Sequence, residues 1–527
     1  MVTLLLACSG TVPDASIAPM LDPVALLVRA SLDLRGVRPS EAELERVENN
    51  PDQLAAALDD LLTDARFYDR LRDLFAEVTL TRTETWPYDF STFGSDAPYE
   101  DIVASVGDHP QRVFAHVVAN DLPITDLVTA DWTVADETLA SLWPVDRPTG
   151  SGWVEATWTD GRPAAGILTS TSLWWRYANS DSNLNRKRAN QVSRILLCHD
   201  YLTRPIEFDR NVNLLDEAAL ADAVANDPGC QVCHVSLDPI AAYMFGFSWV
   251  GDGSAEVVNY HPARERNWED TLGVAPAWYG TPGTDLSDLG RQIAADSRFP
   301  ECMVQRAWEG LMRRDVRDDD FDRLVALRET LITSGSTLKP VFRAILDSDE
   351  YRAAPSADAT DAAVPLKLAS AQLLASQIED LTGYRLVTET TDLLTSDVVG
   401  YLSLAGGADG VYATKAIDAP NTTLLLVQER LAEAAATAVV ASDLADPLNA
   451  HLFNAGALDS LPGSTAFVDQ VQRLHWRIFG RRVESDGDEV SAAADLWNEL
   501  RPVVADDHEA WAALLGSLLR DPDLLLY

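Results

Sequence analysis

The chain has 527 residues, of which 82 are Asp or Glu and 41 are Lys or Arg, so its formal net charge is −41 at pH 7. Such a length exceeds what one hydrophobic core can organise and predicts about two to four domains. A surface this acidic repels phosphate backbones and anionic headgroups, which excludes nucleic acid and anionic lipid as ligands. The charge mainly favours solubility, and an acidic face that docks a basic protein is the alternative.

The first residues resemble a bacterial lipoprotein signal. Leu5-Leu6-Ala7-Cys8 looks like a lipobox, in which a peptidase cuts before the Cys and the Cys8 thiol is lipidated. The apolar run is short and no Lys or Arg precedes Arg29, so either the true start lies upstream or the similarity is accidental. We favour the first interpretation, which predicts a signal remnant and tether over residues 1–22. It also predicts an exported protein, periplasmic or anchored in the outer membrane through lipid only.

Apolar residues recur at i, i+3 and i+4 through most of the chain, which predicts helices. The stretches with this spacing are 23–34, 53–78, 291–312, 320–332, 423–441 and 511–519. Strand-like alternation is scarce and is confined to short runs such as 152–158. The predicted fold class is therefore mostly α, a multidomain helical protein with little β structure.

One helical-hairpin module is predicted three times along the chain. In each copy an apolar helix stops at Gly or Arg, Ser or Asp starts the next helix, and the last helix closes with an aromatic residue. The stops are at Gly36, Arg313 and Gly480, and the closing aromatics are Phe67 with Tyr68, Tyr351 and Tyr527. The copies lie too far apart for a solenoid, so we interpret them as one module reused.

Breaks in this pattern give the domain boundaries. A small, polar, aperiodic stretch at 353–365 is predicted to be a linker, and a second break lies near 279–285. The predicted units are the tether (1–22), an N-terminal helical domain (23–150), a domain with the Cys-x-x-Cys-His motif (151–280), a helical domain packed on it (281–352), the linker (353–365) and a C-terminal helical domain (366–527).

The segment Cys230-Gln231-Val232-Cys233-His234 is a Cys-x-x-Cys-His motif, the pattern that attaches a c-type haem. Two thiols on one helical turn can reach the two vinyl groups of a porphyrin, and His234 can bind the iron as metal ligand. Two alternatives stay open. One is a redox dithiol, which would call for a nearby βαβ unit. The other is zinc, with His199, His261 or Cys302 as additional ligands.

Two further cysteines, Cys198 and Cys302, can form a disulfide in an oxidising compartment, and two buried free thiols are the alternative. The residues that follow them, His199 and Met303, are candidates for the sixth iron ligand, because a disulfide would bring both to one place. Met244, Met312 and His261 are further candidates. Each Met can also be ordinary core filler.

Asn185-Arg186-Lys187-Arg188 is a basic cluster in an acidic chain. These side chains could bind haem propionates, or they could pair with a carboxylate of the protein itself. The second interpretation is favoured because the chain supplies 82 acidic residues.

These segments resemble exported planctomycete-type cytochrome-like multidomain proteins of unknown function. Residues 29–36 with 61–68 resemble their N-terminal cytochrome-like domain. Residues 166–198, the motif and Asp238-Pro239 resemble their Cys-x-x-Cys-His domain, and 299–351 their adjoining domain. The resemblance implies a periplasmic or surface protein and carries over no substrate. The family usually has Met-Asp-Pro after the motif where this chain has Leu237-Asp238-Pro239, so a Met ligand there would be missing.

The sequence therefore predicts a lipid-anchored monohaem c-type cytochrome-like protein, acting as an electron relay or as the haem subunit of a periplasmic oxidoreductase. Its expected partner is a periplasmic or surface protein, such as a redox protein. The alternative is a haem-free lipoprotein scaffold or binding protein held by disulfides. A hydrolase has only dispersed acidic residues and Trp in its favour.

Overall fold

The computed structural model describes residues 19–180, 182–203, 216–247, 253–355, 366–388 and 391–527. The predicted lipidation site Cys8, most of the tether and most of the linker lie outside these residues. Within the described ranges, no helix combines the length and the apolar character needed to span a bilayer.

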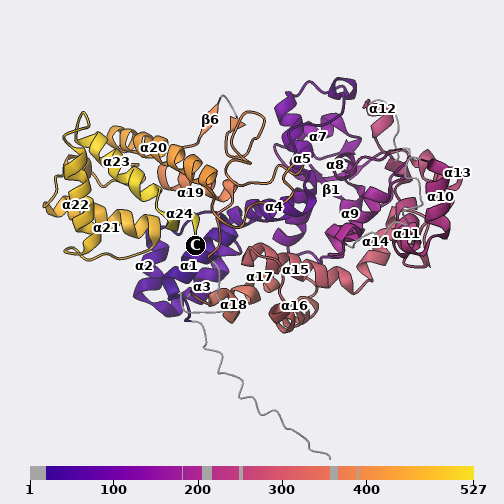
Figure 1. The fold of residues 1–527 in the computed structure, drawn as a ribbon, viewed down its shortest axis with the longest axis horizontal. Helices are drawn as coiled ribbons and strands as arrows, with labels where there is room; N and C mark the ends of the chain where they lie inside the picture. Colours follow the sequence, from indigo (N-terminus) through magenta and orange to yellow (C-terminus); the bar gives the residue numbers. More distant parts are fainter. Residues whose placement is uncertain (1–18, 181, 204–215, 248–252, 356–365, 389–390) are drawn as a thin grey trace, which may run out of the picture.

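The described chain is mostly helical, as predicted (Figure 1). The helices up to the motif are α1 (Pro23–Arg35), α2 (Glu41–Asn49), α3 (Leu54–Leu61), α4 (Ala65–Thr79), α5 (Tyr99–Ala119), α6 (Asp126–Thr129), α7 (Glu137–Leu142), α8 (Thr171–Arg176), α9 (Arg186–Leu196) and α10 (Glu217–Asn226). The next are α11 (Pro228–Ala242), α12 (Ala255–Val258), α13 (Trp268–Thr271), α14 (Leu286–Ala294), α15 (Arg298–Met312), α16 (Phe321–Thr333), α17 (Lys339–Leu346) and α18 (Asp349–Arg352). The last are α19 (Ala371–Thr382), α20 (Thr422–Ala445), α21 (Thr465–Phe479), α22 (Asp488–Leu500), α23 (Asp507–Leu519) and α24 (Pro522–Leu525).

The strands are short and pair antiparallel. They are β1 (Thr133–Ala135), β2 (Val145–Asp146), β3 (Val154–Trp158), β4 (Ala277–Trp278), β5 (Thr281–Pro282), β6 (Val387–Thr388) and β7 (Thr391–Asp392). They form one three-stranded sheet in the order β1-β3-β2 and two hairpins, β4-β5 and β6-β7. In the sheet Val134 pairs with Glu155 and Val145 with Trp158. The predicted alternation at 152–158 therefore becomes the central strand β3.

The three predicted module turns all end a helix with a left-handed residue. Gly36 ends α1 at φ 72°, Arg313 ends α15 at φ 54° and Gly480 ends α21 at φ 69°. Glycine adopts this conformation without a steric penalty, whereas Arg313 carries a Cβ there. Each of these helices is followed by another, which starts after a full capping box at Ser40 in the first copy.

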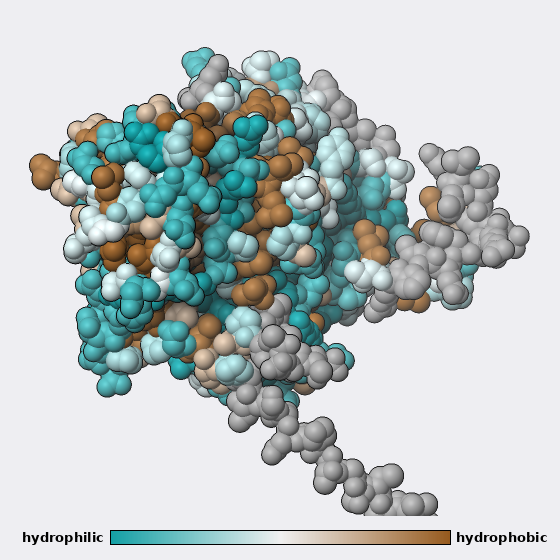
Figure 2. Space-filling model, turned by 60° about the vertical axis from the view of Figure 1, so that its left-hand side comes forward, coloured by the Kyte–Doolittle hydropathy of each residue, from teal (hydrophilic) through white to brown (hydrophobic). Residues whose placement is uncertain are grey.

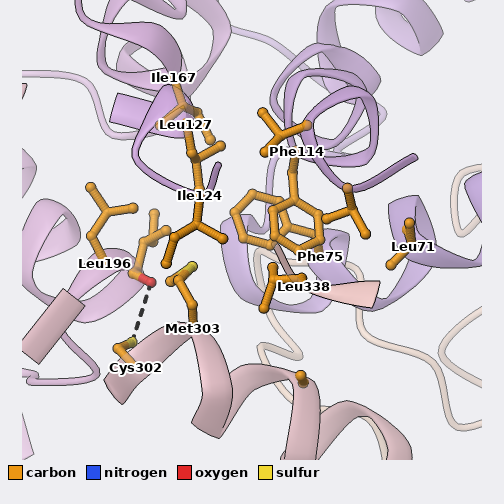
Figure 3. Packing of buried hydrophobic residues seen from close by; sticks show 14 of the residues in the cluster. Leu71, Phe75, Phe114, Ile124, Leu127, Ile167, Leu196, Cys302, Met303 and Leu338 are labelled. Carbon is orange, nitrogen blue, oxygen red and sulfur yellow. Dashed lines mark hydrogen bonds between the residues drawn. The ribbon is translucent and has the colours of Figure 1, made fainter. Parts of the chain in front are cut away.

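Two large hydrophobic cores lie on either side of the predicted linker, and of two smaller clusters one draws residues from both sides. One core draws its buried residues from Leu26 through Tyr351, and the second from Leu368 through Leu525. In the first core Phe75 of α4 stacks on Phe114 of α5 with ring centroids 4.1 Å apart, and Met303 of α15 lies nearby (Figure 3). The boundaries predicted at 150 and 280 therefore do not separate cores. Segments distant in sequence fill one interior, which residue spacing alone does not reveal.

The two units meet at a buried carboxylate. The Asp33 side chain of α1 accepts hydrogen bonds from Tyr351 Oη (2.7 Å), Tyr527 Oη (2.8 Å) and Lys367 Nζ (2.5 Å). Two of the predicted closing aromatics thus converge on Asp33, and one of them, Tyr527, is the chain end marked C in Figure 1. Lys367 and Asp33 are both almost fully buried, so their ion pair is shielded from solvent.

The outer surface of the C-terminal unit is mixed. Figure 2, turned to bring this side forward, shows hydrophobic residues scattered among hydrophilic ones. Leu448 and Tyr412 are the extreme cases, at 96% and 95% exposure. Single exposed apolar residues of this kind are normal on soluble surfaces and need no partner.

A buried histidine in α5 makes stability depend on pH. His109 is 1% exposed, and its Nδ1 and Nε2 lie 2.8 Å from Ser170 Oγ and Thr133 Oγ1. Burial, helped by the nearby Arg162 charge, lowers the pKa of His109 to about 3. Because the unfolded chain binds this proton near its ordinary pKa of about 6.5, the contribution is lost as pH falls from about 6.5 toward 3.

We therefore expect the free energy of unfolding of His109→Gln to depend less on pH below neutrality than that of the wild type. Between pH 7 and pH 5, the free energy of unfolding of the wild-type chain should fall by about 2 kcal/mol because of this residue. The reason is that pH 5 lies about 1.5 units below the pKa of His109 in the unfolded chain. Urea unfolding of both proteins at the two pH values measures the difference. Equal slopes for the two proteins would show that His109 is not buried in its neutral form.

Candidate haem-attachment site

The motif lies on the first turns of α11, a helix with a well-defined start. The Asp227 side chain accepts hydrogen bonds from the backbone N–H groups of Gly229 (2.7 Å) and Cys230 (3.4 Å). Pro228 occupies the first helical position, where its missing N–H costs nothing. Asp227 and Pro228 thus fix where the helix begins, so that Cys230, Cys233 and His234 fall on one face at i, i+3 and i+4.

The two thiols are accessible. Cys230 and Cys233 are both free and half-buried, with Cys233 packed at the edge of the main core. The opposite face of the helix is open to solvent, with Val232 58% and Val235 74% exposed. The motif therefore borders the protein interior without being sealed inside it.

The imidazole of His234 is oriented by a carboxylate one turn along. His234 Nδ1 lies 2.8 Å from Asp238 Oδ1. Asp238, itself 6% exposed, also accepts two hydrogen bonds from Arg186 of α9, from Nε (2.7 Å) and Nη2 (3.0 Å). With its proton held on Nδ1, the ring has its lone pair on Nε2, which is the arrangement of a metal-ligating histidine.

Asp238 stays ionised in this setting. Burial by itself would raise its pKa, but the hydrogen bonds from His234 and Arg186 and the Arg186 charge hold the pKa of Asp238 below its ordinary value. The hydrogen-bonded chain from Arg186 through Asp238 to His234 was not predicted from the sequence. The i, i+4 spacing of His234 and Asp238 was a usable signal, whereas Arg186 comes from a helix 52 residues away.

Arg186 and Arg188, two members of the basic cluster 185–188, make different contacts. Arg186 pairs with Asp238, the protein carboxylate that the sequence favoured over haem propionates. Arg188 is 2% exposed and donates to the backbone carbonyls of Tyr177, Phe247 and Trp174 and to Asn185 Oδ1. Its role is to tie α8 and the segment after α11 to α9.

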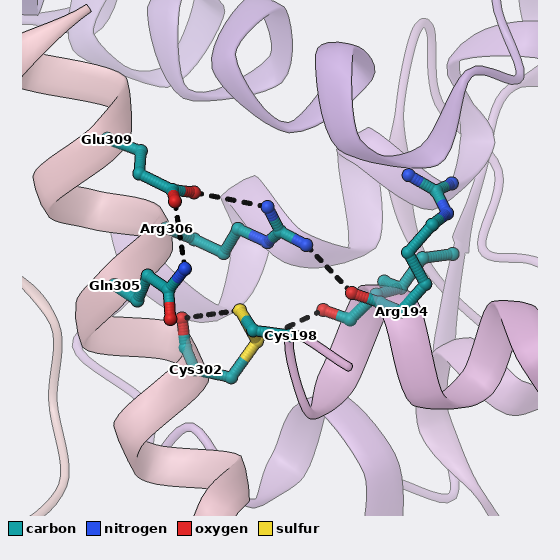
Figure 4. The surroundings of a disulfide bond; sticks show 7 residues. Arg194, Cys198, Cys302, Gln305, Arg306 and Glu309 are labelled. Carbon is teal, nitrogen blue, oxygen red and sulfur yellow. Dashed lines mark hydrogen bonds and ion pairs between the residues drawn. A yellow bond between two sulfur atoms is a disulfide. The ribbon is translucent and has the colours of Figure 1, made fainter. Parts of the chain in front are cut away.

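A disulfide joins Cys198, just after α9, to Cys302 in α15, with their Cα atoms 5.2 Å apart (Figure 4). Next to it Arg306 donates to the Arg194 carbonyl (2.7 Å) and pairs with Glu309 (3.1 Å). This is the pairing that the sequence left as one of two possibilities. It links the helix that carries Arg186 to α15 across 104 residues of chain.

The two preferred sixth-ligand candidates are placed differently. The His199 ring packs edge-on against Tyr201 (centroids 4.7 Å apart), and Tyr201 Oη lies 2.7 Å from Ser236 Oγ on α11. His199 is therefore linked to the motif helix through one side chain. Met303 is 2% exposed and lies in the main core beside Ile124 (Figure 3), so a ligand role for it would require that packing to open.

The position of Leu237 bears on the missing methionine. Leu237 is 9% exposed and belongs to the main core. It lies on the same helix as His234, three residues along, and its side chain packs into that core. Leu237 therefore serves as core packing in this structure, and this position supplies no side chain that could bind iron.

The two alternative chemistries find less support in this geometry. Burial, together with the Asp227 charge, raises the pKa of the Cys230 thiol, which disfavours the thiolate that a redox dithiol needs. All the described strand pairs are antiparallel, so no βαβ unit accompanies the motif there. Over the ranges the structure covers, no three His, Cys, Asp or Glu side chains form a group suited to zinc.

Comparison with known proteins adds one match. Residues 21–145 fit the model of a family described as PSD4, protein of unknown function (DUF1592). The N-terminal segment is therefore similar to that family. No curated protein matches the chain, and no solved structure does. The matched segment covers most of the predicted N-terminal helical domain and does not include the Cys-x-x-Cys-His motif.

Proposed function

We propose that this protein is an exported, lipid-anchored monohaem c-type cytochrome-like protein. It would relay one electron, or serve as the haem subunit of a periplasmic oxidoreductase. The observation that carries the proposal is the face of α11, where two free and accessible thiols adjoin an imidazole already oriented by Asp238. These residues fit a c-type haem.

Each residue has a distinct role in this proposal. The sulfurs of Cys230 and Cys233 would hold the macrocycle through thioether bonds, and His234 Nε2 would bind the iron. His199 would be the candidate second iron ligand, since its ring contacts Tyr201, which is hydrogen-bonded to Ser236 of α11. The group would supply a one-electron couple, while the chain would fix its orientation and its exposure to a redox partner protein.

Two features support export. The Cys198–Cys302 disulfide is typical of an oxidising compartment, where c-type haem is also attached. The lipobox-like sequence before Cys8 would supply the membrane anchor.

Expression in the periplasm of a host with haem-maturation machinery tests the proposal. We expect a c-type Soret band and a colour that stays with the protein after denaturation, because thioether bonds are covalent. The double variant Cys230→Ser/Cys233→Ser should lose it, whereas Val232→Ala, at an exposed spacer position between the same cysteines, should keep it. A colourless wild-type protein would refute the proposal.

The competing function is a haem-free scaffold or binding lipoprotein. The buried junction at Asp33, which fixes two helical units against each other without any cofactor, is the observation in its favour. Cys230 and Cys233 would then be a plain thiol pair or a second disulfide.

A further inference from the structure

We infer that Asp238 and Arg186 are positioning residues that set the reduction potential of the iron through His234, with opposite effects. The inference rests on the proposed haem, and it goes further by assigning the potential to two named side chains outside the motif.

Asp238 acts on the iron through the imidazole of His234. A carboxylate that accepts the Nδ1 proton at 2.8 Å gives the ring more imidazolate character and makes Nε2 a stronger electron donor. A stronger donor, and a negative charge close by, both stabilise ferric over ferrous iron. Because Asp238 is only 6% exposed, solvent screens its charge weakly. Asp238 therefore lowers the potential.

Arg186 opposes the effect of Asp238 on His234. Its two hydrogen bonds draw electron density from the same carboxylate that polarises His234. Arg186 is the first residue of α9, where the helix dipole disfavours a cation, so its position is explained by the pair with Asp238 rather than by helix formation. Removing Arg186 would free the carboxylate to act more strongly on the imidazole.

Lys187 provides a matched control for Arg186. Lys187 carries the same charge on the next residue of α9, but its Nζ lies over the Tyr177 ring, 5.8 Å from the centroid. It is exposed and is not bonded to Asp238. Lys187→Gln thus removes one positive charge from the same helix and leaves the hydrogen bonds of Asp238 with Arg186 and His234 in place.

Redox titration of the purified haem protein, followed by its absorbance, tests the inference. We expect Asp238→Asn to raise the midpoint potential and Arg186→Gln to lower it. Each change should be at least tenfold in the ferrous-to-ferric ratio at fixed potential, which is about 59 mV for one electron. Asp238→Glu should restore most of the wild-type value, and Lys187→Gln should shift it by much less than Arg186→Gln.

The outcomes separate the inference from the proposal beneath it. Shifts of the same sign for Asp238→Asn and Arg186→Gln, or equal shifts for Arg186→Gln and Lys187→Gln, would overturn the inference and leave the haem proposal intact. Wild-type protein without covalent haem would overturn both. A misfolded Asp238→Asn variant would leave Arg186→Gln against Lys187→Gln to decide the sign.

Discussion

Replacing Asp33 by Asn is expected to lower the free energy of unfolding by about 3–5 kcal/mol, the range for a buried ion pair that loses one partner. Asp33 is completely buried and is the common acceptor for Lys367 and two tyrosines. The variant would leave the Lys367 ammonium buried without its counter-charge. Burial already lowers the pKa of Lys367, and Asp33 opposes that effect.

The junction also couples the two cores. Asp33 belongs to α1 of the first unit, whereas Lys367 and Tyr527 belong to the second. We therefore expect the variant to unfold in two separated steps, measured by urea titration with circular dichroism. Asp69→Asn, which removes an exposed carboxylate paired with Arg72, is the control and should cost less than about 1 kcal/mol.

A second substitution sharpens this prediction. Asp33→Asn/Lys367→Met removes both charges, and uncharged replacements of a buried pair can be close to neutral. The double variant should therefore be more stable than Asp33→Asn alone. A double variant no more stable than Asp33→Asn would show that Asp33 acts through its tyrosine contacts and not through its charge.

Loss of the Cys198–Cys302 disulfide should also be large. Its removal in Cys198→Ser/Cys302→Ser is expected to cost about 2–4 kcal/mol, chiefly by freeing a long loop in the unfolded chain. Because Cys302 is 1% exposed, part of the cost comes from hydroxyls placed in an apolar interior.

The reduced protein separates these two contributions. Wild-type protein unfolded in the presence of a thiol reductant should lose the loop contribution and keep the buried sulfurs. Cys230→Ser/Cys233→Ser, which has this disulfide and no other described thiols, should respond to reductant as the wild type does. If the reductant does not change the free energy of unfolding of the wild type, the Cys198–Cys302 disulfide is absent or contributes nothing to stability.

Local features of the fold and the break at 353–365 could be predicted from the sequence, but the set of segments that fill each core could not. Helical periodicity, the capping box at Ser40 and the left-handed stops at Gly36 and Gly480 depend on neighbouring residues, and the structure shows them. The interior that runs from Leu26 to Tyr351 depends on contacts between segments hundreds of residues apart. No periodicity marks which apolar faces will meet.

The same distinction applies to the site. The Cys-x-x-Cys-His spacing and the i, i+4 pair His234–Asp238 are local and legible. Arg186 reaches Asp238 from another helix, and the basic cluster alone did not show which of its members would do so. Met303 follows Cys302 in sequence, but helix α15 turns its side chain into the core (Figure 3). A methionine suits both roles, so residue type could not decide between them.

The intact mass of the purified chain tests the central claim most directly. Protein matured in the periplasm, denatured and treated with reductant, should be heavier than the polypeptide by about 616 Da, the mass of one haem retained through thioether bonds. Cys230→Ser/Cys233→Ser should show the polypeptide mass. A wild-type chain at the plain polypeptide mass after reduction would contradict haem attachment at α11.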